Sequence, residues 1–249
     1  MIGFPSFSFG ERISQMGTKS CSILIKLVLV ISLTFMAAAV ARTEDARIQL
    51  PGPSLDGEVA VEKAIATWKT ARQYAEAPLT MAQVGQMLWA ANGKIPTDAV
   101  SGATGRVIPS AWKVYPLEIF LVTGEKTVEK LQAGVYRYDP DQHSLVTLAK
   151  GDKRGGLSDA AHGQKWIAKV PVAVVIGVDF DKTTGKTTAE QRAEWGRLEA
   201  GMAGQNMLLQ ARALGLKTNT PALFKASELV GALGMPEKFT PVLIVTVGK

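Results

Sequence analysis

The sequence has few of the side chains that usually carry metal or nucleophilic chemistry. Its 249 residues include one cysteine, Cys21, and two histidines, His143 and His162. The cysteine lies near the N-terminus and the histidines are far apart in sequence. A disulfide framework, a cysteine-ligated metal and a histidine-based triad are therefore all disfavoured. We predict no metal site.

Several common ligand-binding signatures are also missing. The sequence contains no G-x-x-x-x-G-K-[ST] motif and no G-x-G-x-x-G after a predicted strand, which disfavours a Walker-type NTPase and a Rossmann dinucleotide domain. The formal net charge is +6, but the basic residues are spread along the chain. Without a basic block, nothing argues for nucleic acid as a partner.

The N-terminal region has the pattern of an export signal. Lys19 and Lys26 precede the apolar run 27–40, and Ala39-Val40-Ala41 supplies an A-x-A cleavage pattern. We therefore predict that residues 1–41 are a secretory signal and that the protein is periplasmic or secreted. An uncleaved membrane anchor is the alternative, although the run is short for a span of ~20 residues. Residues 42–58 are predicted to be an extended arm.

The rest of the chain mixes helices and strands without strict βαβ alternation, which predicts an α+β fold. Thr80 and Gln83 form a capping box at the start of one helix. The helices are predicted at 59–74, 81–91, 157–168 and 226–233. The strands are predicted at 117–122, 135–138, 145–148, 172–178 and 242–247, with the second and third forming a relatively exposed hairpin.

The stretch from Trp195 to Phe224 begins as a long helix that should end at Gly215. Its apolar stripe is predicted to comprise Leu198, Met202, Leu209 and Ala213. Gly201 and Gly204, with neighbouring alanines, predict that another helix, a partner subunit or a flat ligand packs close to it.

The run LEAGMAGQNMLLQARALGL, residues 198–216, resembles the central helix of the FMN-dependent nitroreductase superfamily in its SagB/ThcOx-type branch. That branch carries a run like LEAGHAAQNLLLQAxALGLGT. The resemblance covers residues 59–249. It implies a nitroreductase-like domain there, with a central mixed sheet flanked by helices around a long central helix. It also implies FMN as cofactor and a homodimer with the flavins at the interface.

A second motif, WKTARQY at residues 68–74, places two cations and a hydroxyl close together, a group that can bind phosphate. An exposed basic helix end is the alternative. The segment is similar to the family's R-R-S-x-R-x-F. The resemblance implies that Lys69, Thr70 and Arg72 bind FMN and that Tyr74 is the aromatic residue. Trp68 stands where an arginine is usual.

Three further segments resemble flavin-contacting parts of the family. PSAWKVYPLEIFLV, residues 109–122, is similar to PSAGALYPLEIYLV, whose first residues reach the flavin, commonly across the dimer interface. In the family, the loop after the central helix presents backbone groups to the flavin ring, although the Asn219 and Thr220 side chains could instead simply cap this loop. The ending V-G-K matches V-G-R/K, which binds phosphate, and a solvated terminus is the alternative. The cofactor-binding residues implied are Pro109, Ser110, Ala111, Thr220, Pro221, Ala222, Gly248 and Lys249.

The resulting hypothesis is an exported FMN-dependent oxidoreductase that works by a ping-pong mechanism with a small-molecule electron donor and an electron-poor acceptor. A flavin-binding scaffold without turnover is one alternative. Trp68 favours it, as does the absence of the Lys-Tyr pair of azoline-oxidising members, since Lys186 is followed by Thr187. An exported binding protein for another planar ligand is the second. The resemblance also implies that no side chain is catalytic, because in the family the flavin N5 carries the hydride and no protein base is needed. Glu199 is therefore interpreted as a structural residue.

Overall fold

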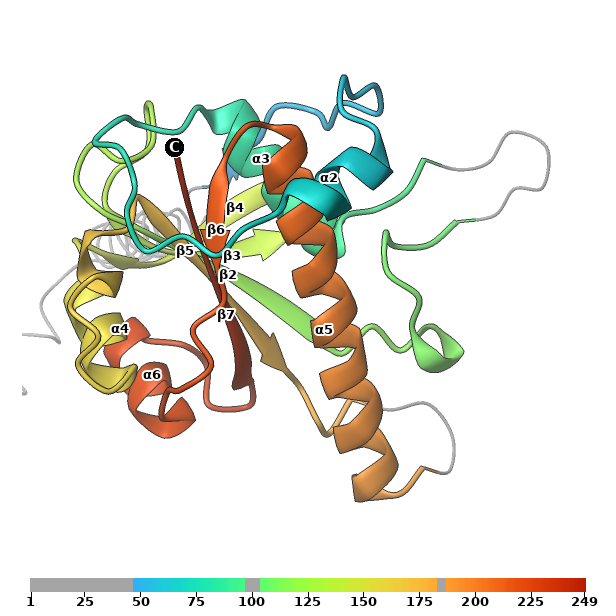
Figure 1. Ribbon diagram of the computed structural model, residues 1–249. Coiled ribbons are helices and arrows are strands. Elements are labelled where there is room, and N and C mark those ends of the chain that lie inside the picture. The colour runs from blue at the N-terminus through green and yellow to red at the C-terminus, as the bar shows by residue number, and fades with distance from the viewer. Residues whose placement is uncertain (1–46, 97–103, 183–186) are drawn as a thin grey trace, which may run out of the picture. The chain divides into compact units, whose positions relative to one another are not determined.

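A seven-stranded β-sheet forms the centre of the structure (Figure 1). The computed structural model describes residues 47–96, 104–182 and 187–249. The strands are β1 (Arg47–Gln49), β2 (Leu117–Thr123), β3 (Gly134–Asp139), β4 (Ser144–Lys150), β5 (Val172–Val178), β6 (Lys217–Asn219) and β7 (Thr240–Gly248). Their order is β1-β4-β3-β2-β5-β7-β6, and each strand pairing is antiparallel. Within the described ranges, parallel pairing occurs at the isolated bridges Thr70–Thr218 and Leu79–Val128.

Helices cover both faces of this sheet. Figure 1 shows α2, α3 and α5 on one side and α4 and α6 on the other. In β2, Ile119 and Leu121 join the first core, whereas Phe120 and Val122 join the second, because successive side chains of a strand point to opposite faces. The helices are α2 (Val61–Thr67), α3 (Met81–Asn92), α4 (Arg154–Ala160), α5 (Ala189–Ala213) and α6 (Ala226–Leu233), with single 3₁₀ turns η1 (Ala111–Lys113) and η2 (Ile167–Lys169). The predicted α+β class is confirmed.

The long helix α5 ends where the sequence predicts but buries a different face. Gly215 follows it with φ 70°, a left-handed conformation that glycine adopts without strain. The predicted stripe was wrong, because Leu198 and Met202 are 58% and 37% exposed. The buried face instead carries small residues that let α5 approach the sheet. A Cβ on Gly196 would lie 2.6 Å from Val178 Cγ1, and one on Gly204 would overlap Leu243.

Three other predictions need correction. The first predicted helix ends at Thr67 rather than at residue 74, because the segment after it is extended along β6. The predicted helix 157–168 divides into α4, which starts at Arg154, and the separate turn η2. The hairpin of β3 and β4 is largely buried rather than exposed. The capping box of α3 and the end of α6 at Gly234 are confirmed.

The described part of the N-terminal arm is attached to the sheet. Its first residues form β1, which pairs with β4. His143 Nε2 lies 2.8 Å from the carbonyl oxygen of Pro51, and the Leu50 backbone N–H donates to the His143 carbonyl oxygen. The arm thus belongs to the same compact unit as the sheet, and this unit comprises Ala46–Lys249. The predicted signal, residues 1–41, lies outside the described residues. None of the described helices is long and apolar enough to cross a membrane.

Candidate functional site

The segment after α2 runs across the ends of the last two strands of the sheet. Thr70 forms a parallel bridge with Thr218 of β6, and the Ala71 backbone N–H donates to the Thr218 carbonyl oxygen at 2.8 Å. Four residues later, the Ala75 N–H donates to the Lys249 carbonyl oxygen, also at 2.8 Å. Backbone pairing therefore brings together three parts of the chain that are far apart in sequence.

Side chains fix this segment at both ends. The Trp68 indole N–H donates to Thr218 Oγ1 at 2.8 Å. The Tyr74 hydroxyl lies 2.6 Å from Thr246 Oγ1. Burial raises the pKa of Tyr74 to about 12, although the hydrogen bond to Thr246 opposes this rise. Tyr74 is therefore a neutral anchor at physiological pH. Trp68 contributes a hydrogen bond where the family has a positive charge.

The anchored segment borders a cavity of about 820 Å³, which we call the basic cavity. It is lined by residues 66–73 together with Arg212, Leu216, Lys217 and Thr218. Lys69, Arg72, Arg212 and Lys217 supply four positive charges, and no acidic residue is among the lining groups. In the part of the chain that the structure describes, none of these four cations forms an ion pair. Such a set of groups suits an anionic ligand.

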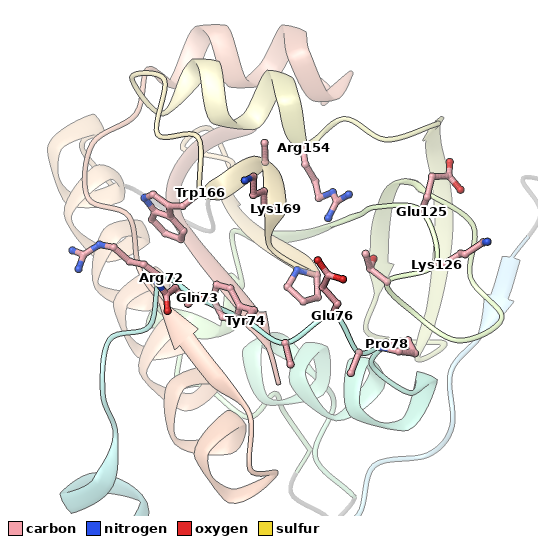
Figure 2. A pocket seen from close by; sticks show the side chains of 15 residues that line it. Arg72, Gln73, Tyr74, Glu76, Pro78, Glu125, Lys126, Arg154, Trp166 and Lys169 are labelled. Carbon is pink, nitrogen blue, oxygen red and sulfur yellow. The ribbon is translucent and has the colours of Figure 1, made fainter.

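A second cavity, of about 610 Å³, continues from the same segment and is called the mixed cavity here. Figure 2 shows Arg72 and Trp166 at one side of it and Glu125 and Lys126 at the other. Glu76 also lines it, so both signs of charge are present. Because Arg72 lines both cavities, it stands at the boundary between them.

The C-terminal residues reach the segment through their backbone. Gly248 pairs with Lys217, and a Cβ on Gly248 would lie 2.7 Å from both Pro171 Cγ and Tyr74 Cδ1. The glycine is thus required by close packing. Lys249 meets the segment through its carbonyl oxygen, and its side chain lines neither cavity.

The predicted loop Thr220, Pro221 and Ala222 follows β6 directly. None of the three lines either cavity, and Pro221 is buried whereas Ala222 is exposed. Just before the loop, the Asn219 side chain is buried, and its Nδ2 has no hydrogen-bond partner among the described residues. A buried donor without a partner carries a cost that a ligand can remove. The four cations of the basic cavity fit the phosphate of a cofactor.

The predicted residues of the 109–111 segment lie elsewhere, beside α5. Ser110 Oγ donates to Glu199 Oε1 at 2.8 Å, and the Ala111 N–H donates to the same oxygen at 3.3 Å. Ser110 Oγ also accepts from the Tyr115 N–H. Pro109, Ser110 and Ala111 line neither the basic nor the mixed cavity. Within one chain, the predicted cofactor residues therefore form two groups.

Glu199 holds this second group in place through its Oε1 atom. It is 3% exposed, and its Oε2 has no hydrogen-bond partner among the described groups. Burial raises the pKa of Glu199, while the hydrogen bonds from Ser110 and Ala111 and the charge of Lys182 oppose the rise. The loop that it fixes is strained, since Trp112, Lys113 and Tyr115 have φ values of 49°, 58° and 49°.

We expect Glu199→Gln to stabilise the protein at neutral pH by about 1 kcal/mol or more, because a buried charge without full compensation is removed. A raised carboxyl pKa means that the folded state binds more protons than the unfolded state above pH 4.5, so the Glu199 contribution is lost as pH rises through the folded pKa. The gain should therefore be small at pH 4 and grow toward pH 8. Urea denaturation across this range measures it. Glu194→Gln, an exposed change on the same helix, is the control. A pH-independent difference would contradict the prediction.

Sequence reasoning missed two residues of the basic cavity, Arg212 and Lys217. Arg212 lies in the last turn of α5 and Lys217 begins β6. Both come within a few residues of the predicted helix end at Gly215. That position was the available signal, because the chain turns there from the helix toward the sheet edge that carries the cavity.

Comparisons with known proteins agree with this fold. Residues 65–249 match the model of the Nitroreductase family. MJ1384 of Methanocaldococcus jannaschii, whose name places it provisionally among the nitroreductases, is 30% identical over 203 residues, covering 81% of this chain and 96% of that protein.

Two solved structures are similar in three dimensions. A nitroreductase-type protein of Ralstonia eutropha JMP134 has a TM-score of 0.68 at 24% identity, covering 83% of this chain and 90% of that one. Another, from Desulfovibrio desulfuricans and solved in complex with FMN, has a TM-score of 0.54 at 17% identity, covering 77% and 86%. With its family-model match extending over most of the sequence, the chain belongs to the nitroreductase family.

Proposed function

We propose that the protein is an exported, homodimeric oxidoreductase that binds FMN and reduces an electron-poor small molecule. The observation that carries the proposal is the basic cavity, which is lined by four cations and by no carboxylate. The cavity lies beside the segment that follows α2 and bridges to β6. Family membership supports the oxidoreductase class. The FMN complex of the Desulfovibrio relative supports the choice of cofactor.

Lys69, Thr70 and Arg72 would hold the phosphate end of the cofactor, since all three line the basic cavity. The chemistry that bound FMN supplies is two-electron transfer through N5, from a donor in one half-reaction and to an acceptor in the next. The chain itself supplies binding and orientation. Asn219, whose buried Nδ2 has no hydrogen-bond partner among the described residues, is our candidate donor to a polar edge of the ring.

The second group of predicted residues motivates the homodimer. Ser110 and Ala111 are fixed by Glu199 to α5, the helix that also carries the exposed side chains of Leu198 and Met202. In a homodimer formed through this face, the 109–111 segment of one protomer would approach the basic cavity of its partner. Both groups would then contribute to one complete site.

Purification of the mature chain tests the proposal. A yellow protein that is bleached by a reductant and recovers its colour with a quinone or a nitroaromatic compound would support the enzyme. Bleaching without recovery would favour a scaffold without turnover. A colourless chain that ignores added FMN would reject both and leave a binding protein for another planar ligand. N-terminal sequencing of secreted material tests cleavage after Ala41.

We expect Arg72→Ala to weaken FMN binding about 10- to 100-fold, the value of a charged hydrogen bond. Arg72 lines the basic cavity without an ion-pair partner among the described residues, so its loss removes binding energy without breaking an ion pair. Flavin fluorescence titration measures the change. Lys150→Ala, which removes an exposed cation at the end of β4, is the matched control. An unchanged FMN affinity would remove Arg72 from the site.

A further inference from the structure

Arg212 is placed to bind a ligand even though it lies in a helix outside the binding motif. Its Nε donates to Thr67 Oγ1 at 2.7 Å, and that hydroxyl in turn donates to the Lys63 carbonyl oxygen. This contact ties the last turn of α5 to the last turn of α2 and fixes the plane of the guanidinium. Arginine has five N–H donors in a rigid fork, so the terminal amino groups are left for a bidentate partner.

The charge of the basic cavity calls for such a partner. Arg212 shares the cavity with Lys69, Arg72 and Lys217, and no carboxylate lines it. Like charges that border one cavity repel each other, and a bound anion reverses that cost. The mixed cavity does not have this imbalance, because Glu76 and Glu125 line it together with its cations. An oxyanion therefore fits the basic cavity better.

The neighbouring Trp68 explains why Arg212 is needed. Trp68 occupies the family's arginine position, and its indole N–H is used by Thr218 Oγ1. It therefore supplies no charge to the cavity. We infer that Arg212, which stands at a variable position of the family's central-helix run, binds the flavin phosphate in place of the missing arginine. The inference rests on the proposed function, since it names a residue of the same site.

A purely structural role for Arg212 makes different predictions. A cation in the last turn of a helix is favourable by itself, and the bond to Thr67 contributes to stability. Loss of that role would affect all ligands of the cavity alike. Loss of phosphate binding would affect FMN and spare riboflavin, which has the same ring and polyol but no phosphate.

The test compares FMN and riboflavin binding to flavin-free wild type and to Arg212→Gln by fluorescence titration at low ionic strength. We expect the FMN dissociation constant to rise about 10- to 100-fold, and that of riboflavin to stay within about twofold. Arg212→Lys, which keeps the charge, should lose less than Arg212→Gln. Arg197→Gln is the control, because Arg197 is an exposed arginine of the same helix that donates to the Ala193 carbonyl oxygen.

Each outcome decides the inference. An equal loss of both flavins, or no loss of FMN, would overturn it. Should wild type bind neither flavin, the proposed function fails, and inorganic pyrophosphate then tests the anion site by itself. Thermal stabilisation of wild type but not of Arg212→Gln by pyrophosphate would uphold Arg212 as an oxyanion-binding residue. Stabilisation of both or of neither would overturn it.

Discussion

Replacing Leu198 and Met202 together by aspartate is expected to convert the proposed flavin-binding homodimer into a flavin-free monomer. Both side chains point away from the sheet on α5 and are exposed in the single chain. Further toward the C-terminal end of α5, a groove of about 830 Å³ is lined by residues of the arm, α2, α3 and α5, including the apolar Leu55 and Val61. Large exposed apolar patches mark interaction surfaces. This surface therefore provides the apolar area that a second copy would cover.

The expected effect is large because a two-fold interface contains each substitution twice. Burying these new charges without partners should weaken association by about 1000-fold or more. Light scattering coupled to size-exclusion chromatography measures the oligomeric state, and the visible spectrum measures bound flavin. Ser227→Asp adds a charge to the exposed face of α6 and should leave both unchanged. A double mutant that remains dimeric would place the interface elsewhere.

Gly248→Val is expected to destabilise the fold by about 3 kcal/mol and to weaken FMN binding at least tenfold. The new side chain would overlap Pro171 and Tyr74, and neither has room to move without loss. Displacing Tyr74 breaks its hydrogen bond with Thr246 and shifts the segment that carries Lys69 and Arg72. One substitution should therefore affect stability and cofactor affinity together.

Urea denaturation and flavin titration measure the two effects of Gly248→Val. Gly231→Ala is the matched control, because no atom lies within 4 Å of the Cβ that it adds inside α6. That change should stabilise the protein by about 0.5–1 kcal/mol, since alanine is the better helix former. A Gly248→Val protein as stable as wild type would contradict the close packing beneath the C-terminal strand.

Local signals in the sequence were sufficient for much of the fold. The apolar run of β5 has buried strand residues throughout, and the capping box of α3 has the predicted hydrogen bonds. The glycines at 215 and 234 end their helices in the left-handed conformation. These features depend on residues within one helical turn or one strand, so the sequence pattern is enough to predict them.

Features that depend on distant contacts were harder to predict. No local sequence signal marks the end of α2 at Thr67. The chain becomes extended there because Thr70 pairs with Thr218, which is distant in sequence. The face of α5 was misassigned because Leu198 and Met202 are exposed, whereas glycines and alanines, together with Met207 and Leu208, occupy the buried face. Arg212 and Lys217 both line the basic cavity because the end of α5 lies against β6. This contact between a helix and the sheet is not visible in the local sequence.

The two border strands of the sheet limit how copies of this protein can associate. β1 and β6 contain three residues each, and Thr70 already bridges the second of them. Borders this short offer few free amides and carbonyls for a strand of another molecule to pair with. Short border strands such as β1 and β6 disfavour sheet extension, the route toward fibrils. In the proposed dimer, the copies would instead meet through the exposed surface of helix α5. There the shapes of the side chains would determine how the two copies are oriented.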